Sequence, residues 1–460
     1  MIPARMPQPQ SPPQRFVWEP QPDADAWMRR VLRDFLSRNP FAASLAIRME
    51  TETATRFLDW VDTIRLPKSD ESSNLLFGLG FAPDTRLFSR CYRHPGAIFP
   101  RVALGESPAT AVVLKVDAVT EFLQAHRLSA PREGPLFNPI RRALVAVSGD
   151  TELWVMERRG SVALDVLEAE QALRLAAQRH LEAFRTRPRA VDNPLDGFAE
   201  AERRIREAIA EIGRDVACAY FFQSEREYWQ RRCKAGAIQK ARQDRLGLGW
   251  ANHDHHTYRS SRAYFVPMMR VFELLGFQYR ERFTPGPEAG WGAQVIEQPN
   301  AGITIFADVD MSPQELLGDF AHEALPERQE LGTVGLWCAL HGEAFLEAGM
   351  HHLECQFNFD QLREQLAGEG LHMMKPFTEL PFLKQAFTEA DLWPVEECRL
   401  QALLARRQIT AEQAERFRRD GAMGAHLENL ERNEGFKGFN QTGIDAIIAN
   451  TDPRLARVEG

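Results

Sequence analysis

The feature that most constrains the fold is an order of elements that occurs twice in the C-terminal half. In its first copy, residues 252–261 (NHDHHTYRSS) alternate like a short polar strand. A helix is predicted over residues 264–277, because Phe265, Met268 and Phe272 recur at helical spacing. Three strand candidates follow, QYRERF, WGAQVIEQ and GITIFADVD. The order is therefore strand, helix and three strands.

The second copy begins at HHLECQF, residues 351–357, and continues with the predicted helix FDQLREQLAGEG. Its three strand candidates are LHMMKPF (371–377), PFLKQAF (381–387) and AHLENLER (425–432). Two such units predict an α+β fold of paired βαβββ units. Residues 312–349 and 389–421 have helical patterns and are predicted to be insertions, the second with a capping box at Thr410 and Gln413. We expect residues 390–425 either to cover a cavity as a lid or to form a helical hairpin on the outer face.

The N-terminal half predicts a separate mixed α/β domain. Residues 26–66 have helical spacing, AVVLKV, ALVAVS and TELWVMERRG are predicted strands, and residues 186–197 contain the Pro and Asp of a linker. We expect a disordered lead-in at 1–22, a mixed α/β domain of unknown role at 23–190, a helical connector of two helices at 198–245, and a domain at 246–455 that contains both repeated units.

Composition excludes several classes of partner. The net charge is −8 and no Lys/Arg block stands out, so we expect no nucleic acid partner. No run of 18 apolar residues is present to cross a membrane, and the N-terminus has no apolar stretch typical of a secretory signal. The six cysteines lack any C-x-x-C pair, which indicates a reducing, cytoplasmic location. Composition leaves open whether the chain forms a homo-oligomer.

Alternation along residues 253–260 places every second side chain on one face of the strand. This face carries His253, His255, Thr257 and Arg259. At about 3.3 Å per residue, the Cα atoms of His255 and Arg259 lie roughly 13 Å apart. A metal on His255 and the guanidinium of Arg259 could therefore hold opposite ends of one small dicarboxylate.

Residues 351–357 supply a second histidine in the same way. His352 and Glu354 share a face, opposite His351, Leu353 and Cys355, which we expect to contact the helix layer. An imidazole buried on the polar face is costly without a ligand or metal. Glu428 or Glu431 could add a carboxylate ligand, and spacing alone does not decide between these two glutamates. Two histidines and one carboxylate are typical of non-haem iron(II) oxygenases.

The chain resembles the 2-oxoadipate dioxygenase/decarboxylase family over roughly residues 245–455. The likeness rests on the following motifs: Asp254-His255-x-x-x-Arg259, VFELLGF followed by RERF, EQPNAGITIFADVD, the strand at His352 with its FDQLREQLAGEG helix, and LENLERNEGFKGF. The family was formerly a domain of unknown function and has a vicinal-oxygen-chelate-like fold.

The resemblance implies that His255, His352 and Glu428 bind Fe(II), and that Arg259 binds the distal carboxylate of the substrate. It implies a decarboxylating dioxygenase that uses O2 and converts 2-oxoadipate to 2-hydroxyglutarate and CO2. Two departures concern the substrate. His351 stands where the family has Asn, and Leu427 and Asn429 replace aromatic residues around the glutamate.

Two alternatives stay open. One is a related vicinal-oxygen-chelate metalloenzyme that acts on a different keto acid or on a diol. Arg259 discriminates here, because a diol does not require a cation on the ligand strand. The other is a non-catalytic metal-binding module, which metal analysis together with O2 uptake would separate from an oxygenase.

Overall fold

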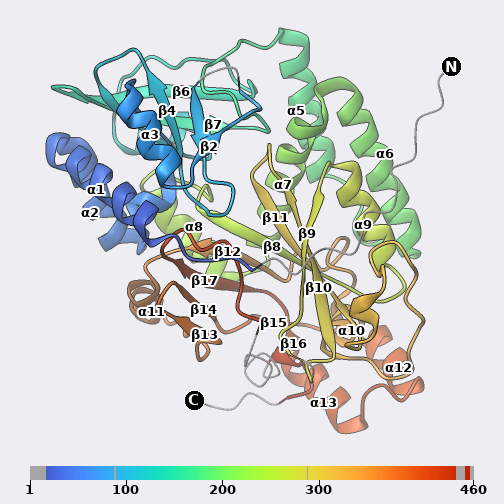
Figure 1. The fold of residues 1–460 in the computed structure, drawn as a ribbon. Coiled ribbons are helices and arrows are strands. Elements are labelled where there is room, and N and C mark those ends of the chain that lie inside the picture. Colours follow the sequence, from blue (N-terminus) through green and yellow to red (C-terminus); the bar gives the residue numbers. More distant parts are fainter. Residues whose placement is uncertain (1–16, 88–89, 287, 442–450, 456–460) are drawn as a thin grey trace.

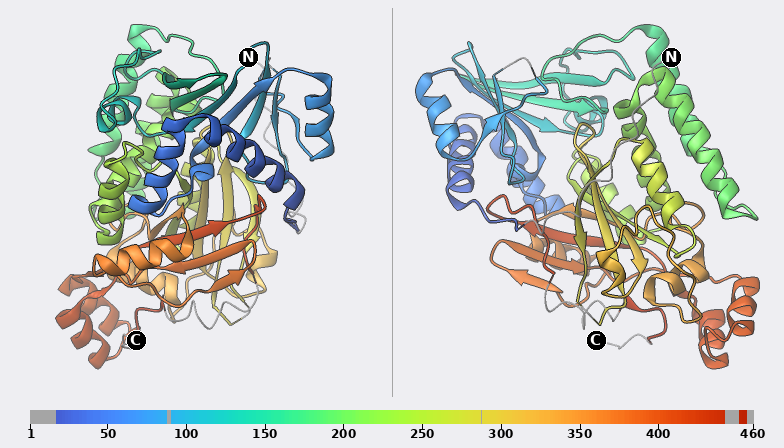
Figure 2. Two further views of the ribbon diagram at one scale, coloured as in Figure 1. Left: turned by 90° about the vertical axis from the view of Figure 1, so that its left-hand side faces the viewer. Right: turned by 45° about the vertical axis from the view of Figure 1, so that its right-hand side comes forward.

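The computed structural model of the chain describes residues 17–87, 90–286, 288–441 and 451–455. Their strands form a seven-stranded sheet, an eight-stranded sheet and a two-stranded ribbon, and Figure 1 shows the first sheet above the second. Helices α5, α6, α7 and α9 stand side by side along one side of the molecule in Figures 1 and 2. The N-terminal strands therefore lie against the sheet that carries the candidate site.

The seven-stranded sheet has the strand order β2-β3-β4-β1-β5-β7-β6. Its strands are β1 (Val61–Pro67), β2 (Ala82–Pro83), β3 (Cys91–Arg93), β4 (Arg101–Gly105), β5 (Thr110–Lys115), β6 (Ile140–Ser148) and β7 (Thr151–Arg158). The expectation of a helix throughout residues 26–66 is wrong at its end. Residues 61–67 form the central strand, which pairs with β4 and β5, because Val61 and Ile64 fit a doubly covered strand as well as a helix.

Helices cover this sheet and connect it to the second one. The first group comprises α1 (Pro22–Arg38), α2 (Pro40–Thr53), the 3-10 helix η1 (Phe57–Trp60), α3 (Asp70–Gly78) and α4 (Val119–Ala125). The connecting group comprises α5 (Gln171–Arg185), α6 (Pro194–Ile212), α7 (Arg214–Gln230) and α8 (Lys234–Asp244). The sequence predicted two helices in the connector, and the structure has three. Gly213 ends α6 at a φ of 79°, a conformation that glycine adopts without strain.

The eight-stranded sheet consists of the two predicted units. The first is β8 (His253–Ser260), α9 (Phe265–Leu274), β9 (Gln278–Phe283), β10 (Trp291–Gln298) and β11 (Ile303–Asp310). The second is β12 (His352–Gln356), α11 (Phe359–Gly368), β13 (Thr378–Leu380), β14 (Leu383–Phe387) and β17 (His426–Arg432). The order β13-β14-β17-β12-β8-β11-β10-β9 joins the units through antiparallel β8 and β12. The paired βαβββ fold, with an N-terminal mixed α/β part, is confirmed.

Two details of the second unit and its insertions differ from expectation. Residues 371–377 were predicted as a strand, but Met373 makes a single bridge to Thr388 and the strand begins at Thr378. Pro376 cannot donate to a ladder, which explains the break. In the insertion at 312–349, helix is limited to the 3-10 turn η2 (Glu315–Leu317) and α10 (Thr333–His341).

The second insertion is a helical hairpin, α12 (Glu397–Ala405) and α13 (Ala411–Asp420), flanked by the ribbon β15 (Leu392–Trp393) and β16 (Ala422–Met423). The predicted capping box of Thr410 and Gln413 is present at the start of α13. The hairpin packs on α10 through one apolar cluster that includes Leu336, Leu400 and Phe417. In both figures it projects from one end of the molecule.

The described part of the predicted lead-in is packed. The indole N–H of Trp18 donates to Glu281 at 3.1 Å, and the backbone N–H of Gln21 donates to the backbone carbonyl of Glu434 at 2.7 Å. Residues 17–22 are therefore anchored rather than disordered, because an indole with a partner for its N–H packs well against a protein surface. The rest of the predicted lead-in lies outside the described residues. No helix in the described part of the chain has the length and apolarity to cross a membrane.

Candidate metal centre

Strands β8, β12 and β17 bring His255, His352 and Glu428 together. The Nε2 atom of His352 lies 3.0 Å from Oε2 of Glu428, and Nε2 of His255 lies 4.0 Å from the same oxygen. One potential ligand atom from each residue lies within 4.8 Å of the others. The three side chains are 6% exposed or less, so they meet inside the protein. Glu431, the alternative carboxylate, accepts from the amide of Phe359 at 2.8 Å and lies on the opposite face of β17.

The ladder explains this convergence. His255 lies opposite Glu354 in the antiparallel pair of β8 and β12, and Glu354 lies beside Glu428 in the parallel pair of β12 and β17. His352, two residues before Glu354, therefore projects from the same face as Glu428. Three strands that are distant in sequence therefore present one polar patch on one face of the sheet.

A β-bulge changes the start of β8. The register shifts between Glu354 and Cys355, so that Asp254 is the extra residue. The expectation that His253 shares a face with His255 is wrong: the His253 ring lies 5.2 Å from that of His256. Asp254 instead lies 3.4 Å from Nδ1 of His255 and forms an ion pair with Arg432.

The carboxylate of Glu354 contacts His255 directly and is linked to Glu428 through Gln385. Its Oε1 lies 2.9 Å from Nδ1 of His255, which is an ion-pair contact without hydrogen-bond geometry, while the hydrogen bond of this nitrogen joins it to Asp254 at 3.4 Å. Both carboxylates lie on the Nδ1 side of the ring, and Nε2 lies on the side of Glu428. Gln385 donates to Glu354 and to Glu428, both at 3.2 Å. Sequence analysis placed Glu354 on the face of His352 but gave it no role. The available signal was its spacing of two residues from His352.

Burial and neighbouring charges set the protonation of these groups. Burial raises the pKa of Glu428 well above its usual range, and the adjacent Glu354 raises it further. Burial and the ring of His426 hold the pKa of His352 well below its usual value, so this imidazole is neutral. Burial also lowers the pKa of His255, but the adjacent carboxylates of Glu354 and Asp254 outweigh it, so this pKa is raised. Two buried carboxylates beside imidazoles form a set of donors that a divalent cation would stabilise.

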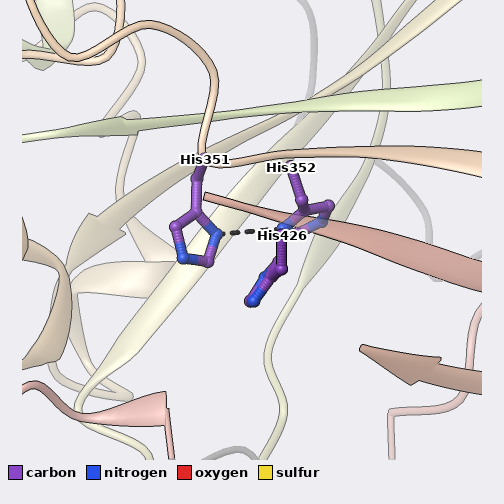
Figure 3. A group of neighbouring side chains, drawn as sticks. All are labelled: His351, His352 and His426. Atoms are coloured by element: carbon purple, nitrogen blue, oxygen red, sulfur yellow. Dashed lines mark hydrogen bonds between the residues drawn. The ribbon is translucent and has the colours of Figure 1, made fainter. Parts of the chain in front are cut away.

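A second histidine cluster adjoins the first (Figure 3). Nδ1 of His351 lies 2.9 Å from Nδ1 of His352, and the rings of His351 and His426 are 4.5 Å apart. We expected His351 to contact the helix layer, and its ring does lie 5.4 Å from that of Trp337 in α10, but its Nδ1 also points to His352. It precedes the first residue of β12, so strand alternation does not govern its direction. His426 was missed, although its place two residues before Glu428 puts both on one face of β17.

Because two acceptor nitrogens cannot bond each other, one of the two Nδ1 atoms carries a proton. If Nε2 of His352 binds a metal, its Nδ1 carries the proton and donates to His351. His351 can thus fix the orientation of the His352 ring.

Arg259 is buried on the face of His255, with 3% of its surface exposed. Its guanidinium lies 5.7 Å from the ring of Trp337, and its ladder neighbour is Asp308. Within the described residues its Nε and Nη1 atoms have no hydrogen-bond partner, and no carboxylate lies within 4.0 Å. The carboxylate of Asp308 attracts the guanidinium from beyond ion-pair distance. A buried cation without a hydrogen-bond partner is costly, so the group can take an anionic ligand, although it does not itself line the cavity that opens on the candidate metal ligands.

A small cavity of about 50 Å3 opens on the three converging side chains. Thr257 and Asp308 also line it, and its aromatic walls are Phe283, Trp291, Phe306, Phe377, Phe387 and Phe439. No residue of 390–425 belongs to its lining. The hairpin α12–α13 therefore packs on the outer side of α10, and the lid expectation is wrong. Two arginines of α13 are paired with carboxylates, Arg418 with Glu397 and Arg419 with Asp420.

Comparisons with known proteins give distant structural likenesses. No protein-family model and no curated protein matches the chain. A mutant of 4-hydroxymandelate synthase from Streptomyces coelicolor is similar at 14% identity, with 87% of this chain and 99% of that chain covered and a TM-score of 0.28. YdcJ from Shigella flexneri, which includes domain DUF1338, has 12% identity, coverage of 56% and 73%, and a TM-score of 0.25. Methylmalonyl-CoA epimerase from Mycobacterium tuberculosis has 10% identity, coverage of 40% and 88%, and a TM-score of 0.23.

Proposed function

We propose that the chain is an Fe(II)-dependent, decarboxylating dioxygenase of a 2-oxo acid that carries a second carboxylate. The substrate class is 2-oxoadipate-like, and the products from 2-oxoadipate are 2-hydroxyglutarate and CO2. One observation carries the proposal: His255, His352 and Glu428 converge at a buried aromatic cavity, with the unpaired guanidinium of Arg259 on the same strand face.

The donor set fits Fe(II). Two imidazole nitrogens and one carboxylate occupy one side of an ion and leave positions open, which is the arrangement of non-haem iron oxygenases. The two buried carboxylates Glu354 and Glu428 are adjacent, and Glu428 has no Lys or Arg within 4.0 Å in the described residues. Bound Fe(II) would supply the redox chemistry that O2 activation requires.

The chain's own residues provide binding and orientation. Arg259 offers two unpaired N–H groups to the distal carboxylate of the substrate, a charge-assisted contact that selects dicarboxylic acids. Asp254 accepts the Nδ1 proton of His255, and Glu354 adds an ion-pair contact to the same nitrogen. His351 accepts the Nδ1 proton of His352, so both rings are held in place. The phenylalanine walls, among them Phe306 and Phe387, exclude water from the reacting atoms.

The experiment is anaerobic loading with Fe(II), followed by a panel of 2-oxo acids scored for O2 consumption and CO2 release. We expect equimolar O2 uptake and CO2 release with 2-oxo dicarboxylic acids. The matched control is Glu431→Gln, a carboxylate of the same strand on the opposite face, which should keep activity when Glu428→Gln loses it. Stoichiometric Fe(II) binding without CO2 release from any oxo acid would contradict the proposal and favour a diol substrate or a non-catalytic metal module.

A further inference from the structure

A second cavity, here called the inter-sheet cavity, lies between the two sheets and apart from the metal centre. Its volume is about 460 Å3, within the range of small-molecule sites, which is about 300–1,000 Å3. Residues of β5, α7 and β8 meet along it, and none of the three candidate metal ligands lines it. Its lining contains ten Lys or Arg and six Asp or Glu residues, although the whole chain has a net charge of −8.

The acids at its inner end are already engaged. Asp62 accepts from Arg158 at 2.7 Å and from Arg101 at 3.0 Å. Asp117 accepts from the amide of Trp250 at 2.6 Å. Asp62 is therefore paired with two arginines, whereas Asp117 is left as an acidic charge that attracts Arg226 from beyond ion-pair distance.

Two cations of the cavity make no close ion pair. In the described part of the chain, the side chain of Lys115 makes no hydrogen bond, neither Lys115 nor Arg226 has a carboxylate oxygen within 4.0 Å, and Asp117 attracts both from a greater distance. The one hydrogen bond of Arg226 joins its Nη1 to Nε2 of His256 at 3.2 Å. Burial lowers the pKa of both groups, which reflects the cost of keeping them charged here. A partly buried, unpaired cation destabilises a fold unless a ligand neutralises it.

His253 completes this end of the cavity. Its Nδ1 lies 2.9 Å from the carbonyl of Trp250 and must donate to it, which leaves Nε2 as a buried acceptor with no partner among the described residues. A ligand hydroxyl could donate to that nitrogen. The cavity thus offers two cations and an acceptor, with room for more than a single inorganic ion.

We propose that the inter-sheet cavity binds a small metabolite with a dianionic group, held by Lys115 and Arg226. Lysine and arginine bind phosphate and carboxylate alike, so the dianion is a phosphate monoester or a dicarboxylate. The site shares no proposed metal ligand with the metal centre, although Asp254, which contacts His255, also lines the inter-sheet cavity.

The test is calorimetric titration of the full-length protein with inorganic phosphate, pyrophosphate and glutarate, together with thermal unfolding. Lys115→Met and Arg226→Gln remove one charge each, and Arg33→Gln, an exposed residue of α1, is the control for net charge. We expect either cavity variant to weaken binding of the preferred dianion by about 10- to 100-fold, and the control to leave it unchanged. Tighter binding of phosphate would indicate a phosphate monoester as the ligand, and tighter binding of glutarate would indicate a dicarboxylate.

The unfolding temperature gives a second readout, which should rise in the variant whose affinity for the dianion falls. Without ligand, Lys115→Met should unfold at a higher temperature than wild type, because an unpaired cation is removed, while the stabilisation by the dianion is lost. Glutarate could also bind at the candidate metal centre. Arg259→Ala distinguishes the two sites, because it should remove binding at the metal centre and leave binding in the inter-sheet cavity unchanged. The proposal is overturned if no dianion binds at millimolar concentration, if Lys115→Met binds as wild type does, or if Lys115→Met lowers the unfolding temperature.

Discussion

Oε1 of Glu354 lies 2.9 Å from Nδ1 of His255, and the charge of this carboxylate attracts the Nδ1 side of a ring whose Nε2 lies toward Glu428. The contact follows from the ladder, in which Glu354 is the cross-strand partner of His255 and the neighbour of Glu428. A carboxylate that orients a histidine in this way is a common partner of metal ligands. It makes metal affinity depend on a residue that need not touch the metal.

We therefore expect Glu354→Ala to weaken Fe(II) or Zn(II) binding by about 10- to 100-fold, as loss of an outer partner of a metal ligand does. Glu354→Gln, which keeps an acceptor oxygen, should lose less. Competition with a chromogenic chelator measures the affinity. Glu379→Ala, at an exposed position of β13, is the control. Equal affinity in wild type and Glu354→Ala would show that His255 is oriented without this carboxylate.

The contact between His351 and His352 predicts a difference between two substitutions. In His351→Asn the amide oxygen can still accept the Nδ1 proton of His352, so metal affinity should stay within about threefold of wild type. His351→Leu leaves this buried N–H without a partner and should weaken metal binding by about tenfold or more. The same chelator competition measures both variants. If His351→Asn and His351→Leu lose affinity equally, the hydrogen bond is not what holds the ring.

Arg259→Met should lower kcat/KM for 2-oxo dicarboxylic acids by about 30- to 1000-fold, which corresponds to about 2–4 kcal/mol. Monocarboxylic oxo acids should be affected less, because they lack the group that the guanidinium binds. The free protein should be at least as stable as wild type, since Nε and Nη1 of Arg259 have no partner to lose. Steady-state kinetics on both acid classes and thermal unfolding test this. An equal loss for both classes, with a lowered unfolding temperature, would assign Arg259 a structural role.

Local periodicity was sufficient for the elements that carry the site. Alternation places His255 and Arg259 on one face of β8, and His352 with Glu354 on one face of β12, as the structure has them. The repeated order of strand and helix predicted the eight-stranded sheet, because each unit has apolar spacing of its own. The same reasoning failed at Val61, where a central strand and a helix bury similar positions.

Non-local pairing explains what the sequence did not reveal. The bulge at Asp254 depends on how β12 pairs with β8, and it reverses the direction of His253. His426 meets His351 because β17 lies beside β12, which is a property of the sheet order. The inter-sheet cavity joins Lys115 and Arg226 from elements that are more than one hundred residues apart. Periodicity within one segment contains none of this information.

The small cavity at the candidate metal centre leads to a prediction about Phe439. A volume of about 50 Å3 is less than that of two liquid water molecules, at about 30 Å3 each, so a six-carbon acid requires the aromatic wall to move. The Phe439 ring packs edge-on against His255 and Phe306, with centroid distances of 5.3 and 4.5 Å. It lies beyond the end of β17, outside the sheet ladder. Phe439 is therefore the wall residue that can move without breaking the sheet.

Phe439→Ala should open the cavity to water as well as to the acid. We expect the ratio of CO2 released to O2 consumed to fall, because water and reductants reach the reacting atoms. Phe436→Ala is the matched control. It removes the same ring three residues earlier, but Phe436 packs with Leu383 and Leu430 and does not line the cavity. Oxygen electrode traces combined with CO2 analysis give the ratio for each variant, with thermal unfolding as the check on folding. A ratio that falls equally in both variants would mean that general loosening of this segment, rather than an opened wall at Phe439, admits the water.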